Sequence, residues 1–202
     1  MDDNEIDFHE KISAFATGVS KDLILQITDA LLPLPLARIV SNGFKAIKER
    51  RYNKAIEAIY ERTKNINPDK NYISSEEFYD MFALTFKKML QARSQEKIEL
   101  FAKILSNEMS TSRIKDYNVE LKEVFIRIIA DLSHLELELL HEMHQGKHNS
   151  KTRSDIYSPD LEKNAALDSL IGKGLIFEEV PTSRIKFSVL GGLLTRYITS
   201  FT

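Results

Sequence analysis

The chain has 202 residues, of which 43% are hydrophobic and 29% charged, and its formal net charge is −2. This composition is typical of a folded, soluble protein and argues against disorder over most of the length. Cysteine does not occur, which excludes disulfides, thiolate zinc sites and a cysteine nucleophile. The acidic start, MDDNEIDFHEK, lacks the basic and then apolar pattern of a secretory signal, so we expect a cytoplasmic protein.

The first apolar pattern predicts an amphipathic helix over residues 4–31, because apolar residues recur there at steps of three and four. This helix must end near Pro33 and Pro35, which lack amide donors and push the preceding residues out of helical geometry. The apolar stretch Ala30–Val40 that surrounds them is too short for a membrane span, which needs about twenty residues. We therefore expect no transmembrane helix here.

A proline-interrupted apolar path cannot form one continuous stripe, so we expect part of Ala30–Val40 to be exposed as a subunit interface. Residues 1–30 carry seven acidic and two basic side chains, whereas residues 38–64 carry eight basic and three acidic ones. These opposite charges would orient a symmetric partner, which predicts a homo-oligomer formed through residues 12–50. The interface candidates are Leu31, Leu32, Leu34, Leu36 and Ile39.

A membrane-surface segment is the alternative for this region, with KAIKERRYNK as its basic flank. The cations of that sequence spread over more than half of a helical wheel, which is wider than a lipid-facing stripe.

Further helices are expected along residues 38–130. One covers residues 38–64 and ends before the turn-rich NINPDKN. Ser74 and Glu77 form a capping-box pattern that begins the next, which continues through a stripe of phenylalanines typical of a protein core. The sequence ARSQEK is either the middle of one long helix or a tight break. Apolar spacing over residues 118–130 predicts another helix.

The C-terminal third combines helices with two short strands. Ser133 and Glu136 form a second capping box, and the helix that they begin should stop near Gly146. Ser158 and Pro159 have the pattern of another helix start, and that helix should end at the sequence GKG. The alternating sequences LIFEEV and RIKFSV predict strands near 176–180 and 184–189, and GGLLTRYITSF then begins a final helix.

This order of elements over residues 132–198 resembles the winged-helix superfamily. The resemblance implies that the second helix of the motif would approach DNA bases, but that helix begins with Asp160 and Glu162. Its two-stranded wing balances Glu178 and Glu179 against two basic residues, whereas phosphate contact needs positive charge. We therefore expect this module to dock a protein partner. The residues that would contact DNA in the alternative are Lys147, Lys151, Arg153, Lys163, Arg184 and Lys186.

We find no motif for catalysis or cofactor binding in the sequence. In particular, neither the dinucleotide-binding nor the P-loop spacing of a glycine-rich phosphate loop occurs. His134, His141 and His144, with a nearby glutamate, are weak candidates for zinc or nickel ligands. However, Leu135, Leu139, Leu140 and Met143 centre on the opposite side of the predicted helix, which places the histidines on its solvated face. We expect no cofactor.

These observations predict a mainly α protein with a helical, bundle-like domain over residues 1–130 and a winged-helix-like α+β domain over residues 131–202. In general texture the chain also resembles uncharacterised helical proteins of bacterial mobile elements and defence loci. The predicted function is a non-enzymatic interaction or regulatory protein that self-associates and docks a protein. The alternatives are a DNA-binding transcriptional regulator, a membrane-associated or defence-related effector, and an enzyme assembled from unmarked polar residues.

Overall fold

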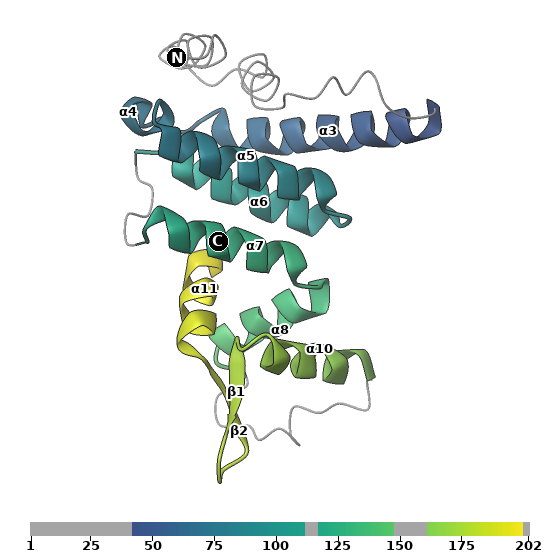
Figure 1. Cartoon of the computed structure of the whole chain (residues 1–202), viewed down its shortest axis with the longest axis vertical. Helices are drawn as coiled ribbons and strands as arrows, with labels where there is room; N and C mark the ends of the chain where they lie inside the picture. The colour runs from purple at the N-terminus through teal and green to yellow at the C-terminus, as the bar shows by residue number, and fades with distance from the viewer. Residues whose placement is uncertain (1–41, 112–116, 148–160, 200–202) are drawn as a thin grey trace. The chain divides into compact units, whose positions relative to one another are not determined.

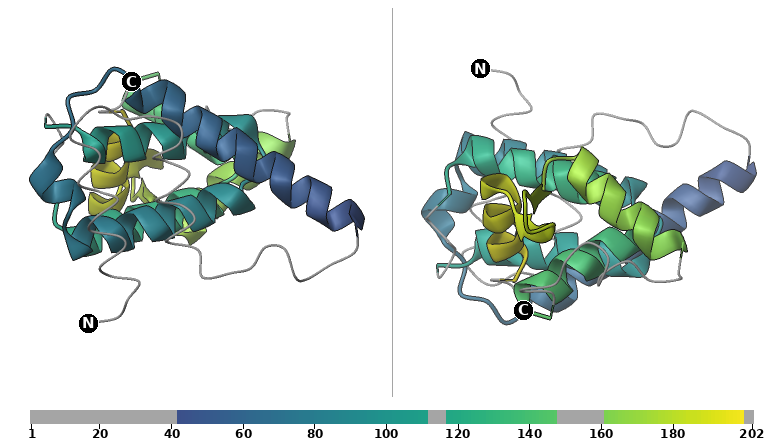
Figure 2. Two further views of the ribbon diagram at one scale, coloured as in Figure 1. Left: turned by 90° about the horizontal axis from the view of Figure 1, so that it is seen from above. Right: turned by 90° about the horizontal axis from the view of Figure 1, so that it is seen from below.

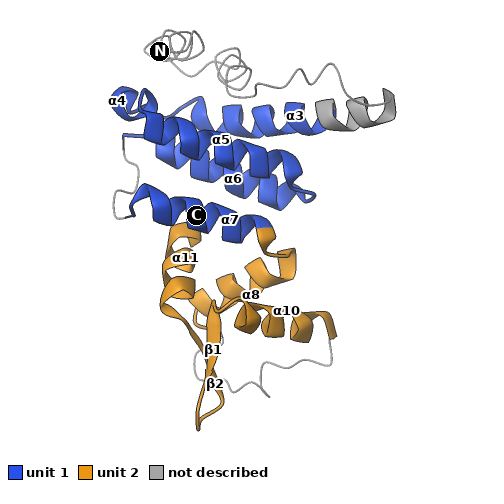
Figure 3. Cartoon of the chain, in the orientation of Figure 1, with its two compact units in different colours: residues 1–130 blue, residues 131–202 orange. Residues whose placement is uncertain are grey.

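The computed structural model describes residues 42–111, 117–147 and 161–199, with side chains from Arg50 onward (Figure 1). The chain divides into two compact units, residues 1–130 (unit 1) and 131–202 (unit 2) (Figure 3). The described residues are mainly helical with one two-stranded antiparallel sheet in unit 2, as the sequence predicted. The expected helix at 4–31 and the interface candidates Leu31, Leu32, Leu34, Leu36 and Ile39 lie outside the described residues.

Unit 1 is built on helices that pack against one another (Figures 1 and 2). Helix α3 contacts both α5 and α6, and α5 contacts α6. None of the helices in the described part of the chain has the length and apolar content that a membrane crossing requires. The helices of this unit are α3 (Asn42–Thr63), α4 (Lys70–Ile73), α5 (Glu76–Gln91), α6 (Gln95–Met109) and α7 (Val119–Asp131).

The phenylalanine stripe of α5 forms the centre of this core. Phe78, Phe82 and Phe86 are each at most 1% exposed. The ring centroids of Phe82 and Phe86 lie 6.0 Å apart in a stacked arrangement, and Tyr52 of α3 meets Phe86 edge-on at 5.9 Å. Large rings buried in such geometries contribute strongly to core stability, so the stripe belongs to the fold.

The start of α5 differs from the prediction by one residue. Its N-cap is Ser75, whose hydroxyl accepts a hydrogen bond from the Phe78 amide at 3.2 Å. The expected cap, Ser74, instead ends α4 and donates its hydroxyl to the Lys70 carbonyl. The reason is that α4, capped by Asp69, occupies a segment predicted as turn and shifts the next helix start. ARSQEK proves to be a tight break, with Ser94 as the N-cap of α6.

A buried ion pair joins α6 to α7. Lys122 Nζ lies 2.8 Å from Glu108 Oε2, and the two side chains are 4% and 0% exposed. The Tyr72 hydroxyl lies 3.5 Å from the same carboxylate oxygen, and the lysine ammonium stands 6.0 Å from the Tyr72 ring centroid. Lys97 of α6 also donates to the Ala130 carbonyl of α7 at 2.7 Å. Polar contacts therefore fix α7 against α6 along its length.

Unit 2 places a β-hairpin between two helices, and its strands fall where the sequence predicted them. Ile176 pairs with Phe187, and Glu179 pairs with Arg184 in the antiparallel register. The capping box at Ser133 and Glu136 is formed as predicted, and Gly174 ends the helix before the hairpin with a φ of +68°. The elements are α8 (His134–His144), α10 (Leu161–Gly172), β1 (Ile176–Glu179), β2 (Arg184–Phe187) and α11 (Val189–Thr199).

The final helix begins at Val189, two residues before the expected start at GGLL. Ser188 precedes it, and its hydroxyl accepts a hydrogen bond from the Gly191 amide at 3.0 Å. The amide and the hydroxyl of Ser188 both donate to the Leu175 carbonyl, which attaches the helix start to the residue before β1. Gly191 lies so close to this carbonyl that an added Cβ would be 1.8 Å from the Leu175 oxygen.

The Gly191 contact predicts that Gly191→Ala destabilises unit 2 by about 3 kcal/mol or more, because backbone must move to admit a methyl group. Gly192→Ala is the matched control, since its Cβ would have no neighbour closer than 3.9 Å. That variant should stay within about 1 kcal/mol of wild type, because alanine favours helix. Urea unfolding measures both, and equal effects of the two substitutions would contradict the proposed contact.

The buried ion pair predicts that Lys122→Met lowers the free energy of unfolding by about 3–5 kcal/mol, because it leaves the Glu108 carboxylate buried beside no cation. Adding Glu108→Leu removes the uncompensated charge. The double variant should therefore recover most of the loss in a urea double-mutant cycle. Additive losses would show that the charges do not act as a pair.

Candidate functional site

The predicted metal candidates all lie on α8. His134, His141 and His144 are exposed, while Leu140 and Met143 on the other face are buried. His144 Nε2 lies 3.3 Å from the Thr199 hydroxyl of α11, and His141 Nε2 contacts the side-chain amide of Gln145. Among the residues that the structure describes, no three histidine or acidic side chains are grouped to hold a metal ion. These histidines therefore give no basis for a metal centre.

The predicted DNA contacts of unit 2 are only partly described, because Lys151 and Arg153 lie outside the described residues. Lys186 Nζ lies 2.5 Å from Glu179 Oε1, and hydrogen bonds from Lys186 and Thr182 hold the pKa of the Glu179 carboxyl below its usual value. Lys147 lies 3.6 Å from Glu142 Oε1.

Two of the DNA candidates have no ion pair among the described residues. Arg184 is exposed and stands opposite Glu179 in the strand register, and Lys163 is half-buried. Carboxylate partners thus neutralise two of the four DNA candidates that the structure describes, Lys147 and Lys186.

Unit 2 exposes large apolar side chains. Of the five exposed among the described residues, Val124 belongs to α7 and the other four belong to unit 2. Val180 is 87% exposed at the hairpin turn, which extends beyond the helices of its unit (Figure 1). We call the four the apolar set, and its members are Leu161, Phe177, Val180 and Val189.

One member of the apolar set occupies a position where the fold itself favours a polar residue. Val189 is the first residue of α11 and is 83% exposed, and Leu161, the first described residue of α10, is 82% exposed. A helix start carries partial positive charge and is stabilised by acidic side chains. Apolar side chains exposed there do not serve local stability, and residues that break a local rule are candidates for function.

A buried carboxylate holds the hairpin in place. Glu136 of α8 is 3% exposed and forms an ion pair with Lys173, which follows the end of α10. Burial raises the pKa of Glu136, but hydrogen bonds from Lys173, the Ser133 amide and Ser169 outweigh it and keep the pKa below its usual value. Because Lys173 lies three residues before the start of β1, this pair positions the strand that carries Phe177.

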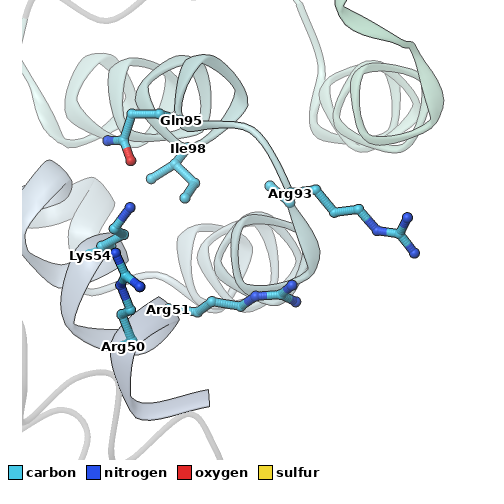
Figure 4. A pocket seen from close by; sticks show the side chains of 7 residues that line it. Arg50, Arg51, Lys54, Arg93, Gln95 and Ile98 are labelled. Carbon is cyan, nitrogen blue, oxygen red and sulfur yellow. The ribbon is translucent and has the colours of Figure 1, made fainter. Parts of the chain in front are cut away.

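A basic pocket lies in unit 1, between α3 and the turn that joins α5 to α6 (Figure 4). Its volume is about 210 Å³. Figure 4 shows the ends of Arg50 and Lys54 close together and facing Gln95 and Ile98, whereas the guanidiniums of Arg51 and Arg93 extend to the other side. The lining residues are Arg50, Arg51, Lys54, Ala92, Arg93, Gln95 and Ile98.

The sequence pointed to only half of this pocket. The basic run KAIKERRYNK is visible in the sequence, where the alternative interpretation is the basic flank of a membrane-surface segment. Arg93 and Gln95 carry no such signal, since ARSQEK predicts either the middle of one long helix or a tight break. The only sign of the pocket in the sequence is that two basic segments occur some forty residues apart. Nothing in the local pattern of either segment shows that they lie together in the fold.

Comparison of the chain with protein-family models, with curated proteins and with solved structures gave no match. The function is therefore inferred from the geometry of these surfaces.

The lowered pKa of Glu136 predicts an acid-dependent loss of stability. The ionised Glu136 adds to the free energy of unfolding above the usual carboxyl pKa of 4.5. This contribution is lost as pH falls through the lower pKa that Glu136 has in the folded state. Urea unfolding of wild type should therefore weaken below about pH 4.5 more steeply than that of Glu136→Gln. Lys173→Met should flatten the same dependence, and identical pH profiles for all three proteins would refute the role of the pair.

Proposed function

We propose that unit 2 is a protein-docking module and that the chain is a non-enzymatic interaction or regulatory protein. The observation that carries this proposal is the apolar set, in which Phe177 and Val180 belong to the hairpin, Val189 begins the helix that follows it, and Leu161 lies at the other end of α10. Exposed apolar surface that the fold does not require is characteristic of protein interfaces. The helix–helix–hairpin–helix order of unit 2 supports our proposal that it is a winged-helix-like module.

DNA binding is the second candidate, and the charges of unit 2 argue against it. Binding to duplex DNA draws much of its affinity from cations that contact phosphates. Lys147 and Lys186 already have carboxylate partners within unit 2, and α10 begins with Leu161 and Glu162. An interface with mixed charge and apolar residues suits a protein surface better than a polyanion.

Self-association remains part of the proposal. It rests on the apolar stretch around Leu34 and on the opposite charges of residues 1–30 and 38–64, which are properties of the sequence. We also propose a cytoplasmic location, since a chain with no cysteine suits a reducing compartment.

The proposal predicts that Val180→Asp with Val189→Asp weakens partner binding at least tenfold while unit 2 stays folded. Both side chains are more than 80% exposed, and an acid at the first position of α11 favours the helix. Affinity purification from the native host with quantitative mass spectrometry would identify the partner. Titration of the purified partner should then show at least a tenfold weaker affinity, roughly 1.4 kcal/mol.

Val124→Asp is the control, because it makes the same kind of substitution, with one added acid, at the one exposed large apolar residue described in unit 1. It should leave partner binding unchanged. If it weakens binding as much as the unit 2 variant, the apolar set is not the interface. If the wild type instead binds duplex DNA tightly with a steep salt dependence, the DNA-binding alternative replaces the proposal.

A further inference from the structure

The basic pocket of unit 1 combines cations from two separate segments in one concave site. Arg50, Arg51 and Lys54 come from two successive turns of α3, and Arg93 comes from the α5–α6 turn. None of the residues that line the pocket is acidic. None of its four cations forms an ion pair or side-chain hydrogen bond with another residue, as far as the described part of the chain extends. Positive charge is therefore available to a ligand.

Basic side chains near the end of α3 differ from those at the pocket in their partners. Arg62, two turns further along α3, pairs with Glu99 of α6 at 3.3 Å, and Glu99 also accepts a hydrogen bond from Gln95. Lys64 pairs with Glu61. The positive charges near the end of α3 thus have carboxylate partners, whereas those at the pocket have none among the described residues. Glu99, four residues after Gln95, is already engaged by Arg62 and Gln95.

The remaining walls favour an anion over other ligands. Ala92 and Ile98 are buried and form an apolar floor, which lowers the local dielectric constant and strengthens charge attraction. Gln95 is the first residue of α6, so the positive end of a 15-residue helix borders the pocket. Guanidinium groups match phosphate oxygens in bidentate geometry, and lysine adds a compact charge.

We propose that this pocket binds the phosphate groups of a small oligophosphate ligand. Arg50 with Lys54 and Arg51 with Arg93 extend to two sides in Figure 4, which favours a ligand with more than one phosphate. A volume of about 210 Å³ holds a few phosphates or a small headgroup, below the 300 Å³ or more typical of sites that enclose a drug-sized molecule. The site belongs to unit 1 and is independent of the docking function proposed for unit 2.

A nucleic acid is the competing polyanion, and the shape of the site disfavours it. Backbone recognition along a duplex uses cations spread over many phosphates, with about 6–10 contacts in a typical complex. Here the four cations line one pocket, with Arg50 and Lys54 on one side and the guanidiniums of Arg51 and Arg93 extending to the other. A compact ligand with more than one phosphate would contact both sides.

The test is isothermal titration of the full-length chain with inorganic triphosphate at low salt. We expect saturable binding with a dissociation constant of roughly 10–100 µM, which corresponds to a modest small-ligand site. Arg50→Gln with Lys54→Gln should weaken it at least tenfold. The matched control, Lys87→Gln with Lys103→Gln, changes the net charge equally at residues of unit 1 outside the pocket and should leave affinity within twofold.

Three further arms make the outcome decisive. ATP competing with triphosphate would identify a soluble nucleotide or metabolite as the source, whereas exclusive binding to vesicles that contain phosphatidylinositol bisphosphate would identify a lipid headgroup. Either result supports the oligophosphate site. No saturable binding up to about 1 mM, or equal losses in both double variants, overturns it. Tighter binding to a 20-nucleotide RNA or a DNA duplex also overturns it, if the affinity falls with salt concentration as steeply as contact with several phosphates requires. That result would indicate a nucleic-acid surface.

Discussion

Burying a carboxylate costs free energy unless a cation lies beside it, and each unit of this protein contains one such pair. Glu108 meets Lys122 in unit 1, and Glu136 meets Lys173 in unit 2. Each pair joins residues from different helices or helix ends, so it fixes orientation as well as compensating charge. Removing one partner of such a pair leaves an uncompensated buried charge, so each pair ties together the elements that carry its two residues.

The two candidate surfaces differ in whether their basic side chains have carboxylate partners. In unit 2, acidic partners engage Lys186 and Lys147, so the hairpin presents apolar side chains on a nearly neutral background. In unit 1, Arg50 and Lys54 border a hollow without carboxylates in its lining, so that region keeps its positive potential. A neutral apolar surface suits a protein partner, and a basic hollow suits a phosphate group. One chain can therefore carry two separate binding properties.

Local rules of helix and turn formation were visible in the sequence. The capping box at Ser133, the glycine that ends α10, and the alternating strands of the hairpin all follow from interactions between residues a few positions apart. The prediction failed by one residue at Ser74, because two adjacent serines can each cap a helix and only the presence of α4 assigns Ser75 to α5. It placed the start of α11 two residues late, because Ser188 is held by Leu175, thirteen residues away.

The sequence by itself determined the mainly helical class, the hairpin, and the burial of the phenylalanine stripe, since periodicity and capping act over one or two turns. Tertiary structure alone decided which charges are neutralised. The partner of Glu136 lies 37 residues away, and Arg93 reaches the same pocket as Arg50 only because α3 packs against α6. Electrostatic matching depends on distance in space, and a linear pattern of charges carries no record of which segments fold together.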